Sequence, residues 1–141
     1  MAEGLKIEIV SPERLVLSET VVSVTVPGTE GYFTVMDDHA PFMTTLKPGF
    51  ITVTKSGGAA DVYFVKGGFA DVSTSGLTIL AEQSVPFTDF DHADLQAQIR
   101  AAEEELNRAA TPEDKSYAQE VVSGLLNLAI EAQHIDGAHV H

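Results

Sequence analysis

Residues 83–99 read QSVPFTDFDHADLQAQI, and the spacing of apolar side chains changes within this stretch. Upstream of it, apolar residues alternate with polar ones; downstream, they recur at every third or fourth position. Asp91 is a suitable helix cap, and Asp94 would lie in the electropositive first turn of that helix. The sequence therefore predicts two domains, a strand-rich one over 1–86 and a helical one over 87–141.

The alternation upstream of this stretch has a period of two. Leu5, Ile7 and Ile9 flank charged residues, and Ile51 and Val53 flank a threonine. This pattern predicts strands with one buried face. Pro and Gly residues interrupt the chain at short intervals, which is typical of tight turns. We therefore expect an antiparallel β-sandwich, not the alternating strands and helices of a nucleotide-binding α/β fold.

The helical part predicts an antiparallel two-helix hairpin, which makes the whole chain an α+β protein. Thr111 is a suitable cap and Pro112 a suitable first residue for a second helix, which should begin its apolar face at Tyr117 and end near Gly137. The short connection requires the two helices to run antiparallel. The residues expected to pack the hairpin are Leu95, Ile99, Leu106, Val121, Leu125 and Leu128.

Composition excludes several classes of protein. The 141 residues carry a net charge of −13 with only 8 Lys plus Arg, so nucleic acid is not an expected partner. The absence of cysteine excludes disulfides and cysteine-ligated zinc. No apolar run approaches the roughly 20 residues of a spanning helix. We also see neither a secretory signal nor a transit peptide, so we expect a soluble or peripheral protein.

Asp37, Asp38 and His39 stand side by side and raise the question of an active site. Carboxylates beside an imidazole suit a divalent metal or proton transfer, whereas Asp is also common in turns. No phosphate-binding loop or nucleophile elbow accompanies them. We therefore expect a turn, with no catalytic residue, metal or cofactor. His139 and His141 could ligate a transition metal, but a frayed chain end is the simpler interpretation.

Five short strings occur in a characteristic order along the chain. They are IVSP at 9–12 followed by Arg14, VPGTEG at 26–31, HAP at 39–41, LKPG at 46–49 and GGF at 67–69. With the order of the two domains, these strings make the sequence resemble the epsilon subunit of bacterial F-type ATP synthases. The resemblance implies a non-catalytic subunit of the central stalk, which couples rotation of the gamma subunit to the membrane c-ring of a proton-translocating enzyme.

The resemblance also assigns residues to partners. In the family, two turns at one end of the sandwich meet the c-ring. The positions that match them are Thr29, Glu30, Gly31, Asp38, His39, Ala40 and Pro41. Gly67, Gly68 and Phe69 are the expected contacts or scaffold for the gamma subunit.

The hairpin of some family members inhibits ATP hydrolysis through basic residues, and some hairpins bind ATP. Residues 91–141 contain three basic and ten acidic residues, so we expect weak or absent inhibition through the alpha and beta catalytic subunits. The ATP motif has arginine where this chain has Asp94, so we expect no useful ATP binding. The resemblance implies a peripheral protein on the cytoplasmic face of the bacterial inner membrane.

Two alternatives come from other functional classes. An acidic adaptor, with a sandwich that binds a basic protein and a hairpin that dimerises, fits the composition but leaves the strings HAP and VPGTEG without a role. A metal-dependent hydrolase built on Asp37, Asp38 and His39 would bind a divalent ion and would lose turnover in the His39→Ala variant.

Overall fold

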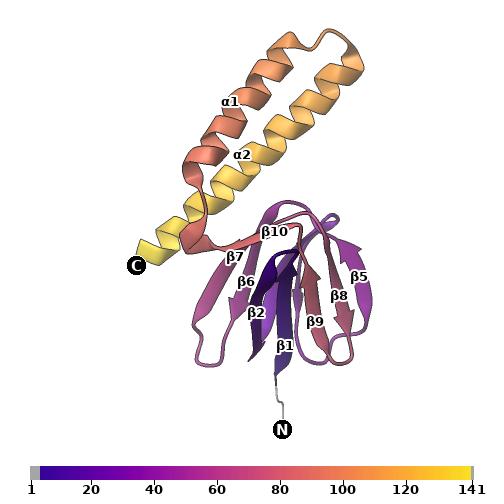
Figure 1. Cartoon of the computed structure of the whole chain (residues 1–141), viewed down its shortest axis with the longest axis vertical. Coiled ribbons are helices and arrows are strands. Elements are labelled where there is room, and N and C mark those ends of the chain that lie inside the picture. The colour runs from indigo at the N-terminus through magenta and orange to yellow at the C-terminus, as the bar shows by residue number, and fades with distance from the viewer. Residues whose placement is uncertain (1–3, 141) are drawn as a thin grey trace. The chain divides into compact units, whose positions relative to one another are not determined.

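The computed structural model describes residues 4–140, with side chains up to Gly137. The chain forms two compact units that meet between Phe90 and Asp91 (Figure 1). This boundary follows Phe90 instead of Pro86 because the aromatic rings after Pro86 belong to the first unit: Phe87 and Phe90 lie with their ring centroids 5.5 and 5.3 Å from that of Phe50.

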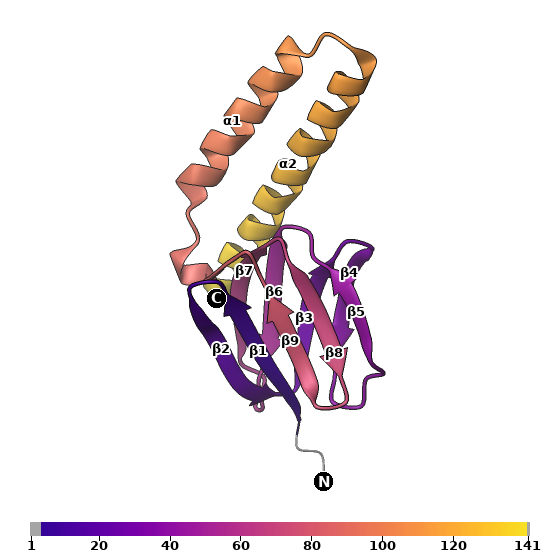
Figure 2. The same ribbon diagram turned by 45° about the vertical axis from the view of Figure 1, so that its right-hand side comes forward.

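The first unit is a β-sandwich of two five-stranded sheets (Figure 2). Sheet A has the order β2-β1-β9-β8-β5, and sheet B has the order β10-β7-β6-β3-β4. A short 3-10 helix, η1 (Phe87–Asp89), follows the last strand. The strands are β1 (Leu5–Ser11), β2 (Arg14–Val21), β3 (Ser23–Gly28), β4 (Gly31–Val35), β5 (Phe42–Thr45), β6 (Gly49–Thr54), β7 (Ala60–Lys66), β8 (Phe69–Ser73), β9 (Gly76–Leu80) and β10 (Gln83–Pro86).

The predicted sandwich is confirmed, and its strands pair antiparallel with one exception. β1 and β9 run parallel, with Ile7 opposite Leu77 and Val10 opposite Leu80. This pair places the first strand of the chain inside sheet A, between its hairpin partner β2 and the late strand β9. Alternation of side chains reports which residues face the core, but it does not report which strand lies alongside.

The core lies between the two sheets and consists of the alternating apolar residues. Leu5, Ile7 and Ile9 are 3%, 0% and 0% exposed, and Ile51 and Val53 are both 0% exposed. Burial of each such side chain stabilises the fold by roughly 1.5 to 3 kcal/mol. Because both sheets contribute side chains to the same cluster, the sandwich has one continuous core.

Gly49 of the string LKPG marks a close approach inside sheet B. A Cβ atom on Gly49 would lie 2.7 Å from both the Pro27 Cβ and the Tyr32 hydroxyl. The Phe50 amide donates a hydrogen bond to that hydroxyl at 3.1 Å, and the Lys47 amine lies 5.4 Å from the centre of the Tyr32 ring. The string therefore fixes a local packing arrangement that only glycine permits.

The second unit is a hairpin of α1 (His92–Arg108) and α2 (Pro112–Val140). The Asp91 carboxylate accepts a hydrogen bond from the Asp94 amide at 2.9 Å, and the Thr111 hydroxyl accepts one from the Asp114 amide at 3.1 Å. Both predicted caps are thus present. α2 continues through Gly137, beyond the end that the sequence predicts. Across residues 4–140, neither helix is long and apolar enough to cross a lipid bilayer.

The packing face of α2 differs from the predicted one in its first turns. Tyr117 and Val121 are 72% and 36% exposed, whereas Ala118 and Val122 are 8% and 9% exposed. Neighbouring apolar residues compete for the face turned to α1, and the small Ala118 allows the closer approach. The other predicted packing residues do turn inward. The buried ones are Leu95, Ile99 and Leu128, and the half-buried ones are Leu106 and Leu125.

Candidate functional site

Four apolar side chains form a row across the outer face of sheet A, which we call the apolar row. Val10 of β1 pairs with Leu15 of β2 and with Leu80 of β9. Leu80 in turn pairs with Phe69 of β8. Residues directly opposite each other on paired strands point to the same face, about 5 Å apart. The apolar row therefore spans four neighbouring strands, although its members come from distant parts of the sequence.

The apolar row is exposed where a solvated sheet face is ordinarily polar. Leu15 is 57% exposed, Leu80 and Phe69 are each 39% exposed, and Val10 is half-buried. An antiparallel sheet with one face on the core usually carries polar side chains on the other. A contiguous exposed apolar patch on a globular domain is typical of a binding surface.

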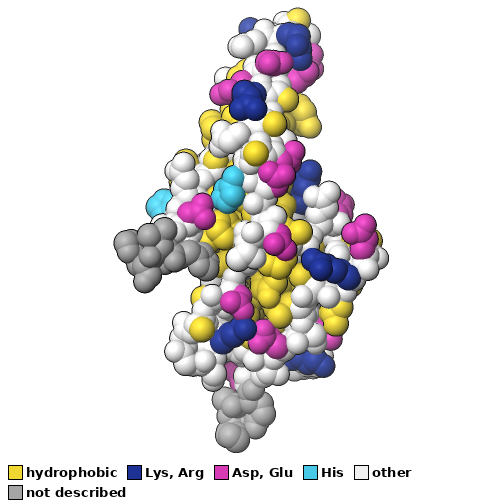
Figure 3. Space-filling view, turned by 60° about the vertical axis from the view of Figure 1, so that its left-hand side comes forward, with side chains coloured by type: hydrophobic (Ala, Val, Ile, Leu, Met, Phe, Trp, Pro, Cys, Tyr) yellow, Lys and Arg dark blue, Asp and Glu magenta, His cyan; other side chains and the backbone are white. Residues whose placement is uncertain are grey.

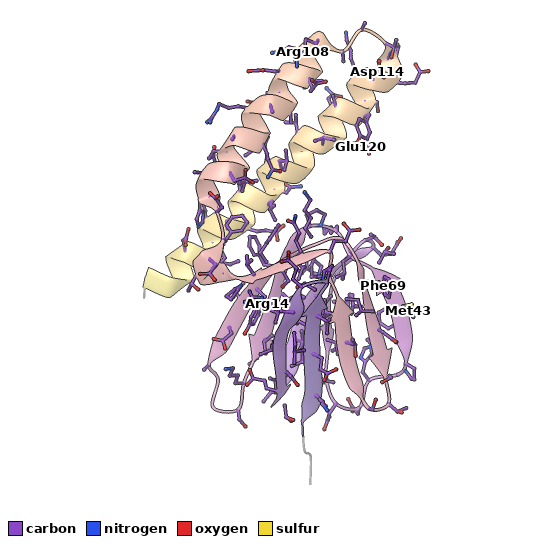
Figure 4. All side chains as sticks on the ribbon, viewed as in Figure 1. Arg14, Met43, Phe69, Arg108, Asp114 and Glu120 are labelled. Carbon is purple, nitrogen blue, oxygen red and sulfur yellow. The ribbon has the colours of Figure 1, made fainter. Side chains whose placement is uncertain are left out.

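The rest of the outer face of sheet A is polar, with one exception. The next row contains Glu8, Thr78 and Asp71, which lie opposite one another on β1, β9 and β8. Met43 continues this row on β5 and is 62% exposed. Figure 4 shows Met43 beside Phe69 on the β5–β8 side of the sandwich. The apolar surface thus covers one end of the sheet face and part of its β5 edge.

Gly67 and Gly68 form the turn that brings β8 into sheet A. Both have positive φ angles, +70° and +97°. A Cβ atom on Gly68 would overlap the backbone carbonyl of Leu80, and one on Gly67 would overlap the Glu82 side chain. Gly68 therefore permits a close approach of backbones beside the apolar row, Gly67 leaves room for the Glu82 side chain, and Phe69 contributes a side chain to the row.

The turn of Thr29 and Glu30 joins β3 to β4, and both residues are exposed. The Thr29 amide donates a hydrogen bond to the Thr45 carbonyl at 3.0 Å, and the two threonine hydroxyls lie 3.1 Å apart. Because β4 ends sheet B and β5 ends sheet A, these contacts join the two sheets along one edge. We call this the β4–β5 edge.

Asp37 and Asp38 form the turn after β4, as the sequence predicted. The His39 amide donates to the Met36 carbonyl at 3.2 Å, which closes the turn. The half-buried His39 ring lies 5.8 Å from the Phe42 ring, measured between centroids. Ala40 and Pro41, both exposed, lead into β5.

The two turns that the resemblance assigns to the c-ring flank β4, and their shared contact with the ring stays a prediction. The turn at Thr29 and Glu30 precedes β4 and the turn at Asp38 and His39 follows it. The five residues of β4 separate the turns by about 16 Å. What the turns share is the β4–β5 edge, whose middle is held by the Phe33 and Phe42 rings, 5.1 Å apart between centroids.

No metal site is formed by the residues that the structure describes. Groups of three or more His, Asp or Glu side chains with suitable geometry are absent from this part of the chain. Asp37 and Asp38 are exposed turn residues. The His139 and His141 side chains lie outside the described residues.

The hairpin carries acidic side chains and few free cations. Arg108 is paired with Glu105 at 2.7 Å, and the hydrogen bond from that arginine to the carboxylate raises the pKa of the arginine. The Asp94 carboxylate accepts a hydrogen bond from the side-chain amide of Gln98 at 2.6 Å. Figure 3 shows acidic side chains spread over the drawn face and not gathered into one cluster. Figure 4 places Arg108 and Asp114 on either side of the connection between the helices.

Comparison with protein families identifies the sandwich. The family described as the ATP synthase delta/epsilon chain, beta-sandwich domain, matches residues 4–87. The chain belongs to this family. An ATP synthase epsilon chain from Mesorhizobium japonicum is 48% identical over 128 residues, which are 91% of this chain and 95% of that relative. An epsilon chain from Rhizobium etli is 46% identical over the same shares of the two chains. The resemblance seen in the sequence is thus confirmed.

Solved structures share the fold at lower sequence identity. A chain in the Euglena gracilis mitochondrial ATP synthase, described as OSCP/F1/c-ring in rotational state 1, has a TM-score of 0.72 at 23% identity, covering 100% of this chain and 84% of that chain. One in the Tetrahymena thermophila mitochondrial ATP synthase, described as central stalk and c-ring, has a TM-score of 0.62 at 14% identity, covering 91% and 95%.

Proposed function

We propose that the chain is a non-catalytic rotor subunit of the central stalk of a proton-translocating F-type ATP synthase. It would couple rotation of the gamma subunit to the c-ring, while other subunits make or hydrolyse ATP. The epsilon-chain relatives and the central-stalk fold neighbours support this assignment. The single observation that carries it is the exposed apolar row on an otherwise polar sheet face.

The apolar row is the proposed binding surface for the gamma subunit. Interfaces that stay assembled need an apolar core surrounded by polar groups. The row supplies that core, and Glu8, Thr78 and Asp71 supply polar neighbours. In this account Phe69 makes the contact, whereas Gly67 and Gly68 are scaffold.

The β4–β5 edge is the proposed contact with the c-ring. Its exposed loop residues are Thr29, Glu30, Asp38, Ala40 and Pro41, and the half-buried Gly31 and His39 lie beside them. Glu30 and Asp38 would meet basic or polar groups on the cytoplasmic loops of the ring, where charge orients the partners. The distance between the two turns favours a contact along the edge over one at a single end.

The hairpin is proposed to inhibit ATP hydrolysis weakly or not at all. Its seven excess negative charges follow from three basic and ten acidic residues. An acidic segment of a catalytic subunit would be repelled. Arg108 already pairs with Glu105, which leaves it less available for such a contact. A many-fold rise in hydrolysis on removing residues 91–141 from the assembled enzyme would contradict this proposal.

The first helix is proposed not to bind ATP usefully. Asp94 stands where ATP-binding relatives carry arginine, and its carboxylate accepts from the Gln98 amide. A carboxylate repels phosphate oxygens. Calorimetry with Mg-ATP should detect no binding up to millimolar concentration, and micromolar affinity would contradict the proposal.

The proposed location is the cytoplasmic face of the bacterial inner membrane, with attachment only through the complex. Fractionation of cells that express the chain tests both the location and the rotor function. A rotor subunit should sediment with membranes and leave them together with the catalytic head when that head is released. A free acidic adaptor should remain in the soluble fraction, and that result would support the alternative class.

A further inference from the structure

Four phenylalanine rings fasten the chain after β10 onto the outer face of sheet B. Phe50 and Phe64 lie opposite each other on β6 and β7, with ring centroids 5.7 Å apart. Their side chains point away from the core, because the next residue of β6, Ile51, is fully buried in it. Phe87 and Phe90 of the following segment pack on these two rings. We call the four rings the aromatic clamp.

The aromatic clamp holds η1 and the residue that follows it. The Phe87 ring centroid lies 5.5 Å from that of Phe50. The Phe90 ring centroid lies 5.3 Å from that of Phe50 and 5.0 Å from that of Phe64. Aromatic rings attract each other at such separations. The Phe90 amide also donates a hydrogen bond to the Phe87 carbonyl at 3.0 Å. Residues 87–90 are therefore fixed to the sandwich by rings and backbone together.

The hairpin holds the very next residue. The Asp91 carboxylate accepts a hydrogen bond from the Asp94 amide at 2.9 Å, and the Asp91 carbonyl accepts one from the Leu95 amide at 3.2 Å. Asp91 is therefore held by α1, whereas Phe90 is held by the sandwich. The peptide bond between them is planar, so rotation at this junction is left to ψ of Phe90 and φ of Asp91. Both residues have an extended backbone, in the broad region where these angles vary without steric clash.

We propose that the hairpin turns relative to the sandwich about these two torsions, and that the aromatic clamp keeps residues 87–90 out of the motion. The chain divides into its two compact units at the same bond. The hairpin then moves as one body with the first turn of α1 intact, without peeling η1 from sheet B. This joint is a property of the chain itself, so it does not depend on the proposed function.

Amide hydrogen exchange of the full wild-type chain, followed by NMR, tests the sandwich side of the joint. The Phe90 amide should exchange at least about tenfold more slowly than the Asp91 amide, after correction for intrinsic rates. The reason is that the Phe90 amide bonds to Phe87, whereas the Asp91 amide has no acceptor among the residues that the structure describes. Equal exchange of the two amides would show that η1 opens with the hairpin, and would overturn the proposal.

Distances between two spin labels, measured by pulsed electron paramagnetic resonance, test the joint. The chain contains no cysteine, so Thr74→Cys in the β8–β9 turn and Asn127→Cys in α2, both exposed, carry the only labels. Asp91→Pro fixes φ at position 91 and restricts ψ of Phe90, whereas Asp91→Ala loses the same cap without either restriction. The distance distribution should therefore be about twofold narrower in Asp91→Pro than in Asp91→Ala. Equal widths would overturn the joint.

The same pair of labels tests the aromatic clamp. Phe90→Ala removes one ring and should widen the distance distribution about twofold relative to wild type, because residues 87–90 then join the motion. Phe42→Ala is the matched control and should keep the wild-type width, since it removes a ring from the contact with Phe33 at the β4–β5 edge. A wild-type width for Phe90→Ala, or an equal widening in Phe42→Ala, would contradict the clamp.

Discussion

Replacing Gly68 by alanine should destabilise the sandwich and disturb the apolar row. The φ angle of +97° is unfavourable for any residue with a Cβ atom, which costs about 1 to 2 kcal/mol. The new methyl group would also overlap the Leu80 carbonyl, a backbone atom that cannot swing aside. Separating β8 from β9 to make room costs roughly another 1 to 3 kcal/mol. We therefore expect a loss of about 2 to 5 kcal/mol.

Gly58→Ala is the matched control for this substitution. Gly58 has nearly the same φ angle, +94°, but a Cβ atom added to it would meet nothing within 4 Å. Gly58→Ala should therefore lose only the roughly 1 to 2 kcal/mol that a Cβ atom costs at a positive φ angle, without the cost of separating two strands. Thermal unfolding followed by circular dichroism measures both variants, with about 4 to 8 °C expected per kcal/mol for a domain of this size. Equal melting temperatures for the two variants would refute the close approach of Gly68 and Leu80.

Three further substitutions test local features of the structure. Gly124→Ala in α2 should stabilise the hairpin by about 0.5 to 1 kcal/mol, because Gly124 lies inside a helix with open space around it; a destabilised hairpin in thermal unfolding would contradict this. Asp91→Ala should cost about 1 kcal/mol through loss of the cap on the Asp94 amide, and unchanged helix melting would count against the cap. Lys55 donates to Asp61 at 2.7 Å, and this bond chiefly raises the pKa of the lysine above 10.5. Its small stabilisation is present below pH 10.5 and is lost as the pH rises through the raised value. Urea unfolding of wild type and Lys55→Met should therefore converge at high pH, and a constant difference would contradict the pairing.

The sequence predicted those features that depend on local spacing. Alternation at Leu5 and Ile51 identified the core faces, and the side chains of Asp91 and Thr111 identified the helix starts, because periodicity and caps involve residues close together in the chain. The face of α2 that packs against α1 was harder to predict from the sequence. Val121 is next to another apolar residue, and spacing alone does not show which of the two faces α1.

Only part of the candidate site could be predicted from the sequence. Phe69 was assigned to the gamma contact from a short string, but of its partners in the apolar row Val10 only appeared in the string IVSP without a role, and Leu15 and Leu80 were not noticed. Their juxtaposition depends on the parallel pairing of β1 with β9 and on the register of four strands. Exposed alternating positions in separate strands give no signal of contact until that register is known.

The affinity of the full chain for the gamma subunit shows whether the apolar row is a binding surface. Leu80→Ser removes an exposed apolar side chain from the apolar row, and Thr20→Ser changes an exposed residue at the other end of the β1–β2 pair. We expect tight binding by the wild type and by Thr20→Ser, and binding weakened at least about tenfold by Leu80→Ser, since loss of a buried leucine costs roughly 1.5 to 3 kcal/mol. Equal affinities for all three chains would contradict the assignment of the apolar row as the surface that joins this subunit to the rotating shaft.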